Sequence, residues 1–477
     1  MSSSVASRRG NWAIVLMAVA IGGIVRLAAA RGELWLDEVW SLTMVRGLQS
    51  VTEVFTRLRI DNNHHLNSVW LFLVPEGSAL IAYRLWGVVC GTAALCTAAA
   101  MSAPRGRGPL LGAVLCCGSS YLLVHYSSEA RGYAPLMLFV LSAWWTRQKA
   151  RATGSARWNA LYAVSCCLGF LSHIAFMQFF VPAAFLDVVG AVRSKRSSSE
   201  AVQRRGKGFG AILLRVGIPG VFFCLFWLIS LRGMGIGGGN PAAYLEVILE
   251  TLAISVGVPA SEIGSLIGAA IAFCLIVGVT AHLWRIEPDE GLLFVGAAIV
   301  MPAVLLGLMG REDIYPRYFL VGIILFQWGL GDWLGSLIQS RGSGTRRIAG
   351  WICLVLFVSA NGVRDAELIR LGRSHYLEML EYVKSHSRSE PAFITADHPF
   401  RQGMMLSFYL PRSSAGEKVR MATQAGEVPE WILVHGQGPE LDRQTTIDHP
   451  QLGHFELVRK YPAVKLSGWD LMLYQKR

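Results

Sequence analysis

The chain has 477 residues, of which 53% are hydrophobic and only 16% are charged. Soluble globular domains average roughly 25% charged residues, so this composition excludes an ordinary soluble protein and indicates a polytopic membrane protein. The formal net charge of +12 would suggest a nucleic-acid partner for a soluble chain. The positions of the basic residues therefore decide whether that partner is considered further.

Apolar stretches long enough to cross a bilayer recur along the chain, since one helical crossing needs about 17 to 25 mostly apolar residues. The candidate spans are 11–30, 79–101, 109–125, 132–145, 158–172, 174–190, 211–230, 263–284, 291–309, 317–337 and 350–363. They predict an α-helical polytopic membrane protein with about 11 transmembrane helices. Several stretches are short, so tilted or broken helices are expected.

Basic residues gather in every second connection between these spans. They are Arg8, Arg9, Arg105, Arg285 and those within 147–151, 193–208 and 341–347. This positive-inside pattern places the N-terminus in the cytoplasm and the alternate connections outside, and it argues against nucleic acid as a partner. We expect a multi-pass plasma-membrane protein whose C-terminal part is extracytoplasmic. A cleaved signal peptide is the alternative for the N-terminus, but Arg26 interrupts its apolar run.

The C-terminal part differs in composition from the rest of the chain. The segment YLEMLEYVKSH has helical spacing of apolar residues, whereas AFITA, WILVH, FELVRKY and DLMLYQK are typical of short strands. We predict a transmembrane domain over 1–363, with a first outward loop at 31–67, and a small extracytoplasmic α/β domain over 364–477.

Four stretches on the predicted outer side carry ionisable groups near the membrane boundary. Asp37 and Glu38 lie in LWLDEVWSL, His64 and His65 in DNNHHLNSVWLF, Glu129 and Arg131 in SSEARGYAPLMLF, and Arg317 in YPRYFL. Each group alone is an ordinary interface anchor. Together on one side they predict a shared outward cavity, since ionisable groups at membrane depth are usually functional.

These four motifs, in this order, resemble those of the type-C glycosyltransferases. The likeness is to the branch that contains protein O-mannosyltransferases and the lipid A aminoarabinose transferase, and it covers residues 11–180 best. It implies a membrane enzyme that takes a sugar from a polyprenyl phosphate and transfers it, with inversion, to an extracytoplasmic lipid, glycan or protein acceptor. One departure is visible, because His65 stands where relatives often carry proline.

The resemblance also implies roles for individual residues. A carboxylate would remove the proton of the acceptor, and Asp37 is our candidate for this base. Fixed cations would stabilise the leaving phosphate. The predicted site comprises Asp37 and Glu38 as catalytic acids, Arg131, Arg317, His64 and Tyr318 as donor-phosphate ligands, and Glu129, Tyr133, His65, Asn67 and His173 as further substrate contacts.

Two alternatives remain open at this stage. A transporter or flippase of lipid-linked sugars would need the same cavity without the chemistry, but it would favour repeated halves, which the sequence lacks. A divalent metal could use Asp37, Glu38 and His64 as ligands, although their spacing is not diagnostic. All nine cysteines lie inside proposed spans, so no disulfide framework and no thiolate metal site is predicted.

Overall fold

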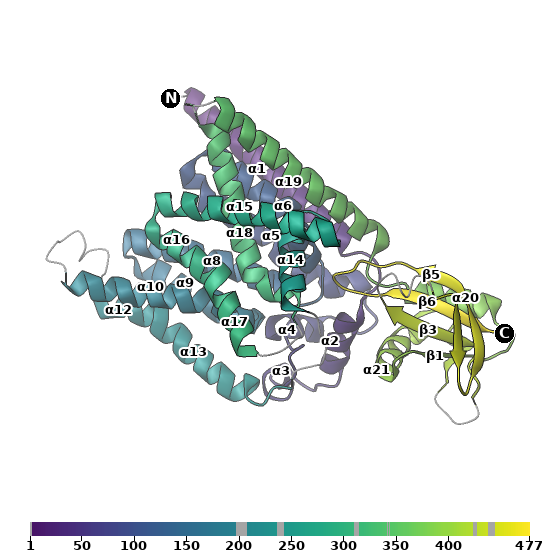
Figure 1. Ribbon diagram of the computed structural model, residues 1–477. Coiled ribbons are helices and arrows are strands. Elements are labelled where there is room, and N and C mark those ends of the chain that lie inside the picture. The colour runs from purple at the N-terminus through teal and green to yellow at the C-terminus, as the bar shows by residue number, and fades with distance from the viewer. Residues whose placement is uncertain are drawn as a thin grey trace. The chain divides into compact units, whose positions relative to one another are not determined.

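The computed structural model describes residues 2–196, 208–235, 243–309, 314–340, 342, 344–422, 427–436 and 444–477. The chain divides into two compact units. The first unit contains Met1–Ala30, Leu48–Pro75 and Tyr83–Asp365, and the second contains Arg31–Gly47, Glu76–Ala82 and Ala366–Arg477. The acidic segment at Arg31–Gly47 thus belongs to the same unit as the C-terminal residues, although the sequence suggested one continuous loop at 31–67. Figure 1 labels the helices and strands of the chain.

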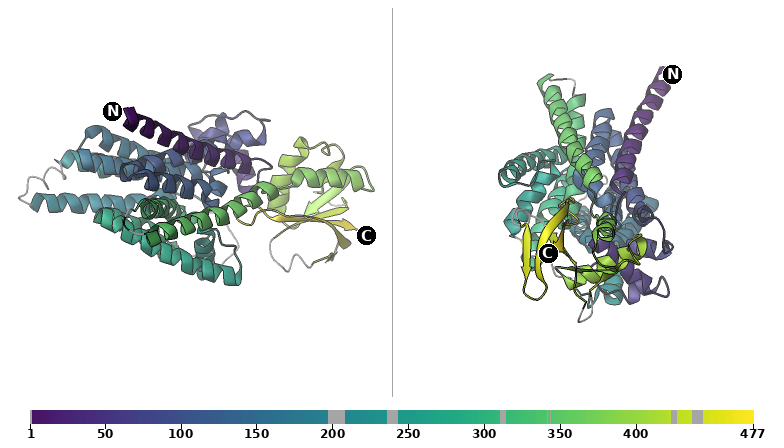
Figure 2. Two further views of the ribbon diagram at one scale, coloured as in Figure 1. Left: turned by 90° about the horizontal axis from the view of Figure 1, so that it is seen from above. Right: turned by 90° about the vertical axis from the view of Figure 1, so that its right-hand side faces the viewer.

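The first unit is built of helices, and its long helices lie side by side (Figure 2). The α-helices are α1 (Ser2–Ala29), α3 (Glu53–Thr56), α4 (His65–Leu73), α5 (Leu80–Ser102), α6 (Arg107–Ser119), α7 (Tyr121–Ser127), α8 (Tyr133–Thr153), α9 (Ala156–Ser172), α10 (Met177–Arg196), α12 (Gly208–Ile212), α13 (Ile218–Phe226), α14 (Tyr244–Ser255), α15 (Glu262–Ile286), α16 (Pro288–Val295), α17 (Met301–Met309), α18 (Leu320–Gln339) and α19 (Gly344–Leu371). Short 3-10 helices lie at η1 (Ala103–Arg105), η2 (Ile174–Phe176) and η6 (Pro316–Phe319), and π-helical turns at η3 (Leu213–Gly217), η4 (Trp227–Leu231) and η5 (Gly296–Val300).

All eleven predicted spans fall on helical segments. Among the described residues, six segments are long and apolar enough to cross a membrane: Leu80–Arg105, Ile174–Arg193, Gly210–Leu231, Glu262–Ile286, Pro288–Leu308 and Pro316–Gln339. The bent pair α6 and α7 would make a seventh. The helical membrane fold is therefore confirmed, whereas length and composition of the helices do not establish about eleven crossings.

The predicted span at 109–125 is broken rather than straight. Helices α6 and α7 meet at an angle of 61°, and Ser120 between them has an extended backbone. The backbone N–H of Tyr121 donates to Oδ1 of Asn361 at 2.9 Å. A side chain from α19 thus satisfies a backbone group that the break releases, as a lipid-embedded chain requires.

Helices α6 and α18 approach each other along a stripe of glycines. A Cβ atom on Gly112 would lie 2.1 Å from the carbonyl oxygen of Gly331, and one on Gly108 would lie 2.1 Å from that of Gly335. The two glycines of each helix are four residues apart, which is the spacing that lets membrane helices touch backbone to backbone. Larger side chains at these positions would force the helices apart.

The second unit combines helices with a mixed sheet. Its helices are α2 (Leu36–Arg46), α20 (Tyr376–His386), α21 (Pro399–Arg401), α22 (Ser407–Tyr409), the π-helical turn η7 (Gln402–Leu406) and the 3-10 helix η8 (Leu410–Arg412), and its strands are β1 (Ala392–Ala396), β2 (Val419–Met421), β3 (Trp431–Gly436), β4 (Thr446–His449), β5 (Gly453–Tyr461) and β6 (Asp470–Lys476). The strand order is β2-β1-β3-β6-β5-β4, with β1 parallel to both neighbours and the other pairs antiparallel. The predicted helix and four strands are all present. A core of Ile432, Phe455, Met472 and Tyr474 holds one part of the sheet together.

Candidate active site

Three segments of the first unit converge at Gly132. A Cβ atom there would lie 2.2 Å from the carbonyl oxygen of Ser172 and 2.6 Å from Cβ of His64. Gly132 has an ordinary negative φ of −77°, so space rather than backbone conformation requires glycine. Its neighbours Arg131 and Tyr133 are thereby brought against His64, at the start of α4, and against the end of α9.

An aromatic cluster forms around this point. The ring of His64 stacks on that of His173 with centroids 4.9 Å apart, and both rings lie within 5.3 Å of the Tyr133 ring. The guanidinium of Arg131 lies 5.0 Å from the Tyr133 centroid. We call His64, Arg131, Tyr133, His173 and Arg317 the His–Arg cluster. Four of these predicted residues come from three separate motifs, and the fifth, His173, lies outside the motifs.

Both arginines of the His–Arg cluster act on the same imidazole. Burial first, and then the charges of Arg131 and Arg317, lower the pKa of His173 to about 3. Arg131 is only 4% exposed, and its Nη2 donates to Oδ1 of Asn62 at 2.7 Å. The Arg317 guanidinium lies 4.0 Å from the ring centroid of Tyr315. Two fixed guanidinium groups beside uncharged imidazoles form a site suited to an anion.

His64 offers a hydrogen-bonding group within this cluster. Burial, and then the neighbouring His173 and Arg131, hold the pKa of His64 well below its usual value, so its ring is neutral at pH 7. Its Nε2 atom is buried and has no hydrogen-bond partner among the residues that the structure describes. Most buried polar atoms have such a partner. This nitrogen is therefore a candidate ligand for substrate.

Asn67 and His65 have partners that attach α4 to its surroundings. Nδ2 of Asn67 donates to the carbonyl oxygen of Ala130 at 2.7 Å, directly before Arg131. Nε2 of His65 lies 2.5 Å from the hydroxyl of Ser230, at the end of another helical segment. Both contacts are buried. These two hydrogen bonds help to hold the His–Arg cluster in place. They do so independently of any contact that Asn67 and His65 make with substrate.

Glu129 and Tyr318 also have defined partners within the bundle. The Glu129 carboxylate lies 3.1 Å from Nε2 of His125, and both side chains are fully buried. The backbone carbonyl of Tyr318 accepts a hydrogen bond from Gln178 at 2.8 Å, which fixes the short helix that carries Arg317. Glu129 thus belongs to a buried pair, and Tyr318 orients its neighbour through the backbone.

The acidic pair lies in the second unit, on helix α2. This segment was predicted to be part of an outward loop, but it is helical, so adjacent side chains point about 100° apart. Glu38 is fully buried, and its Oε2 accepts a hydrogen bond from the backbone N–H of Trp35 at 3.1 Å. Glu38 therefore caps the start of its own helix. Asp37 is partly exposed and is the member of the pair that solvent reaches.

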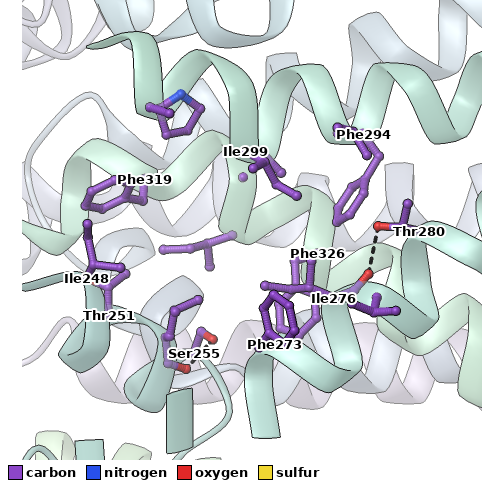
Figure 3. Close-up of a pocket in the computed structure, with 18 of the residues that line it drawn as sticks. Ile248, Thr251, Ser255, Phe273, Ile276, Thr280, Phe294, Ile299, Phe319 and Phe326 are labelled. Carbon is purple, nitrogen blue, oxygen red and sulfur yellow. Dashed lines mark hydrogen bonds between the residues drawn. The ribbon is translucent and has the colours of Figure 1, made fainter. Parts of the chain in front are cut away.

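A large apolar cavity opens in the first unit between α14, α15, α18 and the segment from α16 to α17. Its volume is about 840 Å³. Figure 3 shows side chains that line it. The hydroxyls of Thr251, Ser255 and Thr280 line it, but each donates to a carbonyl of its own helix. They offer no free donor to a ligand, so the cavity suits an apolar guest. Phe319 lines the cavity and ends the same 3-10 helix that carries Arg317.

Some features of this site were not predicted from the sequence. Asn62 and Tyr315 lie within the quoted motifs. The motifs alone did not indicate that Asn62 contacts Arg131 or that Tyr315 contacts Arg317. The cavity gave no sequence signal because its lining is ordinary span composition. Within the described ranges, no group of three or more His, Cys, Asp or Glu side chains is arranged to hold a metal ion.

Comparisons with known proteins place this geometry in a fold. No protein-family model and no curated protein matches the sequence. The crystal structure of ArnT from Cupriavidus metallidurans bound to undecaprenyl phosphate matches with a TM-score of 0.53 over 97% of this chain and 98% of that chain, at 11% sequence identity. Its apo state matches with the same TM-score and identity over 97% of each chain. The chain has the type-C glycosyltransferase fold.

The resemblance that the motifs suggested is thus confirmed for the fold. Arabinosyltransferase EmbB from Mycobacterium smegmatis is also similar, with a TM-score of 0.44 and 9% identity over 83% of this chain and 42% of that chain, which is too low to support an argument. The match to ArnT extends over nearly all of both chains, so it includes both units.

Proposed function

We propose that the chain is a membrane glycosyltransferase that transfers a sugar from a polyprenyl-phosphate-linked donor to an extracytoplasmic acceptor. The observation that carries the proposal is that the short helix η6 contributes residues both to the His–Arg cluster and to the apolar cavity. Within this short helix Arg317 belongs to the His–Arg cluster and Phe319 lines the apolar cavity. A phosphate attached to a long apolar chain needs both features side by side.

In the proposed reaction, an acceptor hydroxyl or amine attacks the anomeric carbon of the donor sugar. Asp37 takes the proton of the acceptor, and the bond between the anomeric carbon and the phosphate oxygen breaks with its electron pair going to that oxygen. A single displacement of this kind inverts the anomeric carbon. Polyprenyl phosphate leaves with an additional negative charge.

The His–Arg cluster would stabilise that charge. Arg131 and Arg317 can each hold phosphate oxygens with a planar fork, and their attraction grows as negative charge develops on the leaving group. His64, in the tautomer with its proton on Nε2, would donate to a phosphate oxygen through its unpartnered nitrogen. The aromatic rings around these groups keep them in place.

The apolar cavity would hold part of the polyprenyl chain. Its volume of about 840 Å³ is at the upper end of the range of ligand pockets, about 300 to 1,000 Å³. ArnT, which shares the fold, was crystallised with undecaprenyl phosphate bound. The acceptor, whether lipid, glycan or protein, and the identity of the sugar are separate questions that a panel of substrates addresses.

The experiment that tests the proposal uses the purified full-length protein in detergent with a panel of polyprenyl-phosphate sugars and a membrane fraction as the source of acceptors. We expect release of free polyprenyl phosphate together with transfer of labelled sugar. Tight binding of donors without release on any acceptor would contradict transfer and favour a transporter of lipid-linked sugars. Analysis of the anomeric configuration of the product tests inversion.

The proposed orientation places the second unit outside the plasma membrane and the turn after α8 in the cytoplasm. Single cysteines at the exposed positions Ser389 and Thr153 in a cysteine-free background test this. An impermeant thiol reagent should label Ser389→Cys in intact cells that lack an outer barrier, and label Thr153→Cys only after lysis. The opposite pattern would invert the orientation.

A further inference from the structure

Within the second unit, the start of α20 is attached to the segment before α2. Oε2 and Oε1 of Glu33 accept hydrogen bonds from the backbone N–H groups of Tyr376 and Leu377 at 2.5 and 3.0 Å. These N–H groups lie in the first turn of α20, where helix donors lack intrahelical partners and negative charge is favoured. One carboxylate thus ties the segment that leads into α2 to a helix more than 340 residues further along the chain.

A second attachment acts on the next residue. The hydroxyl of Tyr409 donates to the carbonyl oxygen of Leu34 at 2.7 Å, and this contact is buried. The ring of Tyr409 stacks on that of Tyr376, with centroids 5.3 Å apart and planes 8° from parallel. Leu34 therefore has no freedom to shift without disturbing two buried aromatic rings.

A hydrogen-bond chain fixes Tyr376 itself. Its hydroxyl is hydrogen-bonded to Nε2 of His435, and Nδ1 of His435 lies 2.6 Å from Oδ1 of Asp397. Burial, and then the charge of Asp397, raise the pKa of the Tyr376 hydroxyl well above its usual value, so it stays protonated. Asp397 follows β1 and His435 lies on β3, so the chain ends on two paired strands of the sheet.

Helix α2 is also held along its length. The ring of Trp40 contacts that of Phe400 edge to face at 5.8 Å, so a contact from α21 follows one turn after the capped start of the helix. Glu38 caps that start through Trp35. Attachments at Glu33, Leu34 and Trp40 fix both the position and the rotation of the helix that carries Asp37.

We propose that the C-terminal domain positions the catalytic carboxylate: Glu33, Tyr409 and the Asp397–His435–Tyr376 chain are positioning residues that set the orientation of Asp37 on α2. This inference rests on the proposed function, in which Asp37 is the base. A general base must lie within hydrogen-bonding reach of the proton that it removes, and an error of 1 Å can lower a rate about 100-fold. The C-terminal domain then contributes to the rate without touching the reacting atoms.

The first test compares two tyrosines of the second unit. Tyr409→Phe removes the hydroxyl that holds Leu34, whereas Tyr474→Phe removes a hydroxyl that donates to the carbonyl of Gln444 at 2.9 Å. Each variant loses one hydroxyl-to-carbonyl bond and keeps its ring. We expect Tyr409→Phe to lower kcat roughly tenfold with the donor KM within about twofold, and Tyr474→Phe to change neither.

The second test compares two carboxylates that accept backbone N–H groups. Glu33→Gln turns an amide donor toward one of the two α20 N–H groups, and Glu430→Gln makes the matched change at the backbone N–H of Arg388. Only Glu33→Gln should lower kcat. Hydrogen–deuterium exchange of residues 36–46 in the full-length variants measures the attachment of α2 independently of catalysis, and it should be faster in Tyr409→Phe and Glu33→Gln alone.

The outcomes separate this inference from the proposed function. Unchanged exchange of α2 in both variants overturns the inference, as does an equal loss of kcat in the Tyr474→Phe and Glu430→Gln controls. Faster exchange with unchanged kcat also overturns it, because α2 would then move without affecting transfer. If the wild-type protein shows no sugar transfer but α2 exchanges faster in the Tyr409→Phe and Glu33→Gln variants, the attachment of α2 is supported and the proposed function is contradicted.

Discussion

The His–Arg cluster and the acidic helix are held in place by different kinds of contact. In the first unit, His64, Tyr133 and His173 pack ring against ring, and Gly132 lets their backbones touch. In the second unit, α2 buries Leu36, Val39, Leu42 and Val45, and hydrogen bonds to backbone groups hold the segment at its start. An added methyl disturbs the packed rings of the cluster directly, whereas loss of a hydrogen bond at the start of α2 changes the position of the helix end that carries Asp37. Substitutions in the two regions should therefore fail in different ways.

The largest expected effect is that of Asp37→Asn. The change keeps the size of the side chain and removes the proton acceptor, so turnover should fall about 100-fold or more while donor binding stays within a few-fold. Single-turnover transfer and equilibrium donor binding measure the two quantities. Asp448→Asn, on an exposed side chain of β4, is the control. Near-normal turnover of Asp37→Asn would assign the base to another carboxylate.

For substitutions in the His–Arg cluster we expect both the affinity for the donor and the rate of transfer to fall. Arg131→Lys and Arg317→Lys keep the charge but lose the planar fork that grips phosphate. A hydrogen bond to a charged group contributes about 1.5–3 kcal/mol, so donor affinity should fall roughly 10- to 100-fold. Arg57→Lys, at an exposed pair with Glu53, should leave it unchanged. A pure kcat effect in the cluster variants would argue against contact with the donor phosphate.

Gly132→Ala tests whether close packing holds the cluster together. The added methyl would meet the Ser172 carbonyl at 2.2 Å, and overpacking of this kind destabilises by about 1–3 kcal/mol. Thermal unfolding in detergent and donor affinity should both decline. Gly190→Ala on α10 meets nothing within 4 Å and is the matched control, for which no loss is expected. Equal stability of the two variants would mean that the backbones at Gly132 can separate freely.

Narrowing the apolar cavity should affect donors according to their chain length. Ala303 lines the cavity, and Ala303→Phe would fill part of it. The KM for a long-chain donor should rise roughly tenfold, while that for a donor with a short prenyl chain should change little. The short-chain donor thus controls for damage to the rest of the site. Equal effects on both donors would place the polyprenyl chain elsewhere.

The smallest predicted effect concerns acid stability of the second unit. Burial alone would raise the pKa of Asp397, but the hydrogen bond and charge of His435 outweigh it and lower the pKa. A carboxyl whose folded pKa is depressed adds stability above its unfolded pKa of about 3.9, and this is lost as pH falls through the folded value. Unfolding of wild type and Asp397→Asn, followed by tryptophan fluorescence, should differ by less than about 1 kcal/mol at pH 6 and converge below pH 4. A difference that grows as the pH falls would reverse the sign.

The sequence by itself determined the helical character of the predicted spans, four of the strands and the members of the His–Arg cluster. Apolar length and helical spacing placed all eleven stretches on helices, and alternation located β1, β3, β5 and β6, because these patterns depend on neighbours along the chain. His64, Arg131 and His173 were identifiable because charged and polar groups at membrane depth are rare enough to be informative.

Only the tertiary structure decided which segments far apart in the chain contact one another. Glu38 could not be recognised as a helix cap while its segment was predicted to be a loop. The union of Arg31–Gly47 with the C-terminal residues depends on contacts such as that of Tyr409 with Leu34, 375 positions apart. The apolar cavity likewise arises where α14, α15, α18 and the segment from α16 to α17 meet. Hydrogen bonds and packing between residues far apart in the chain produce no periodic pattern in the sequence. The reason is that the residues around each partner follow only the pattern of their own helix or strand.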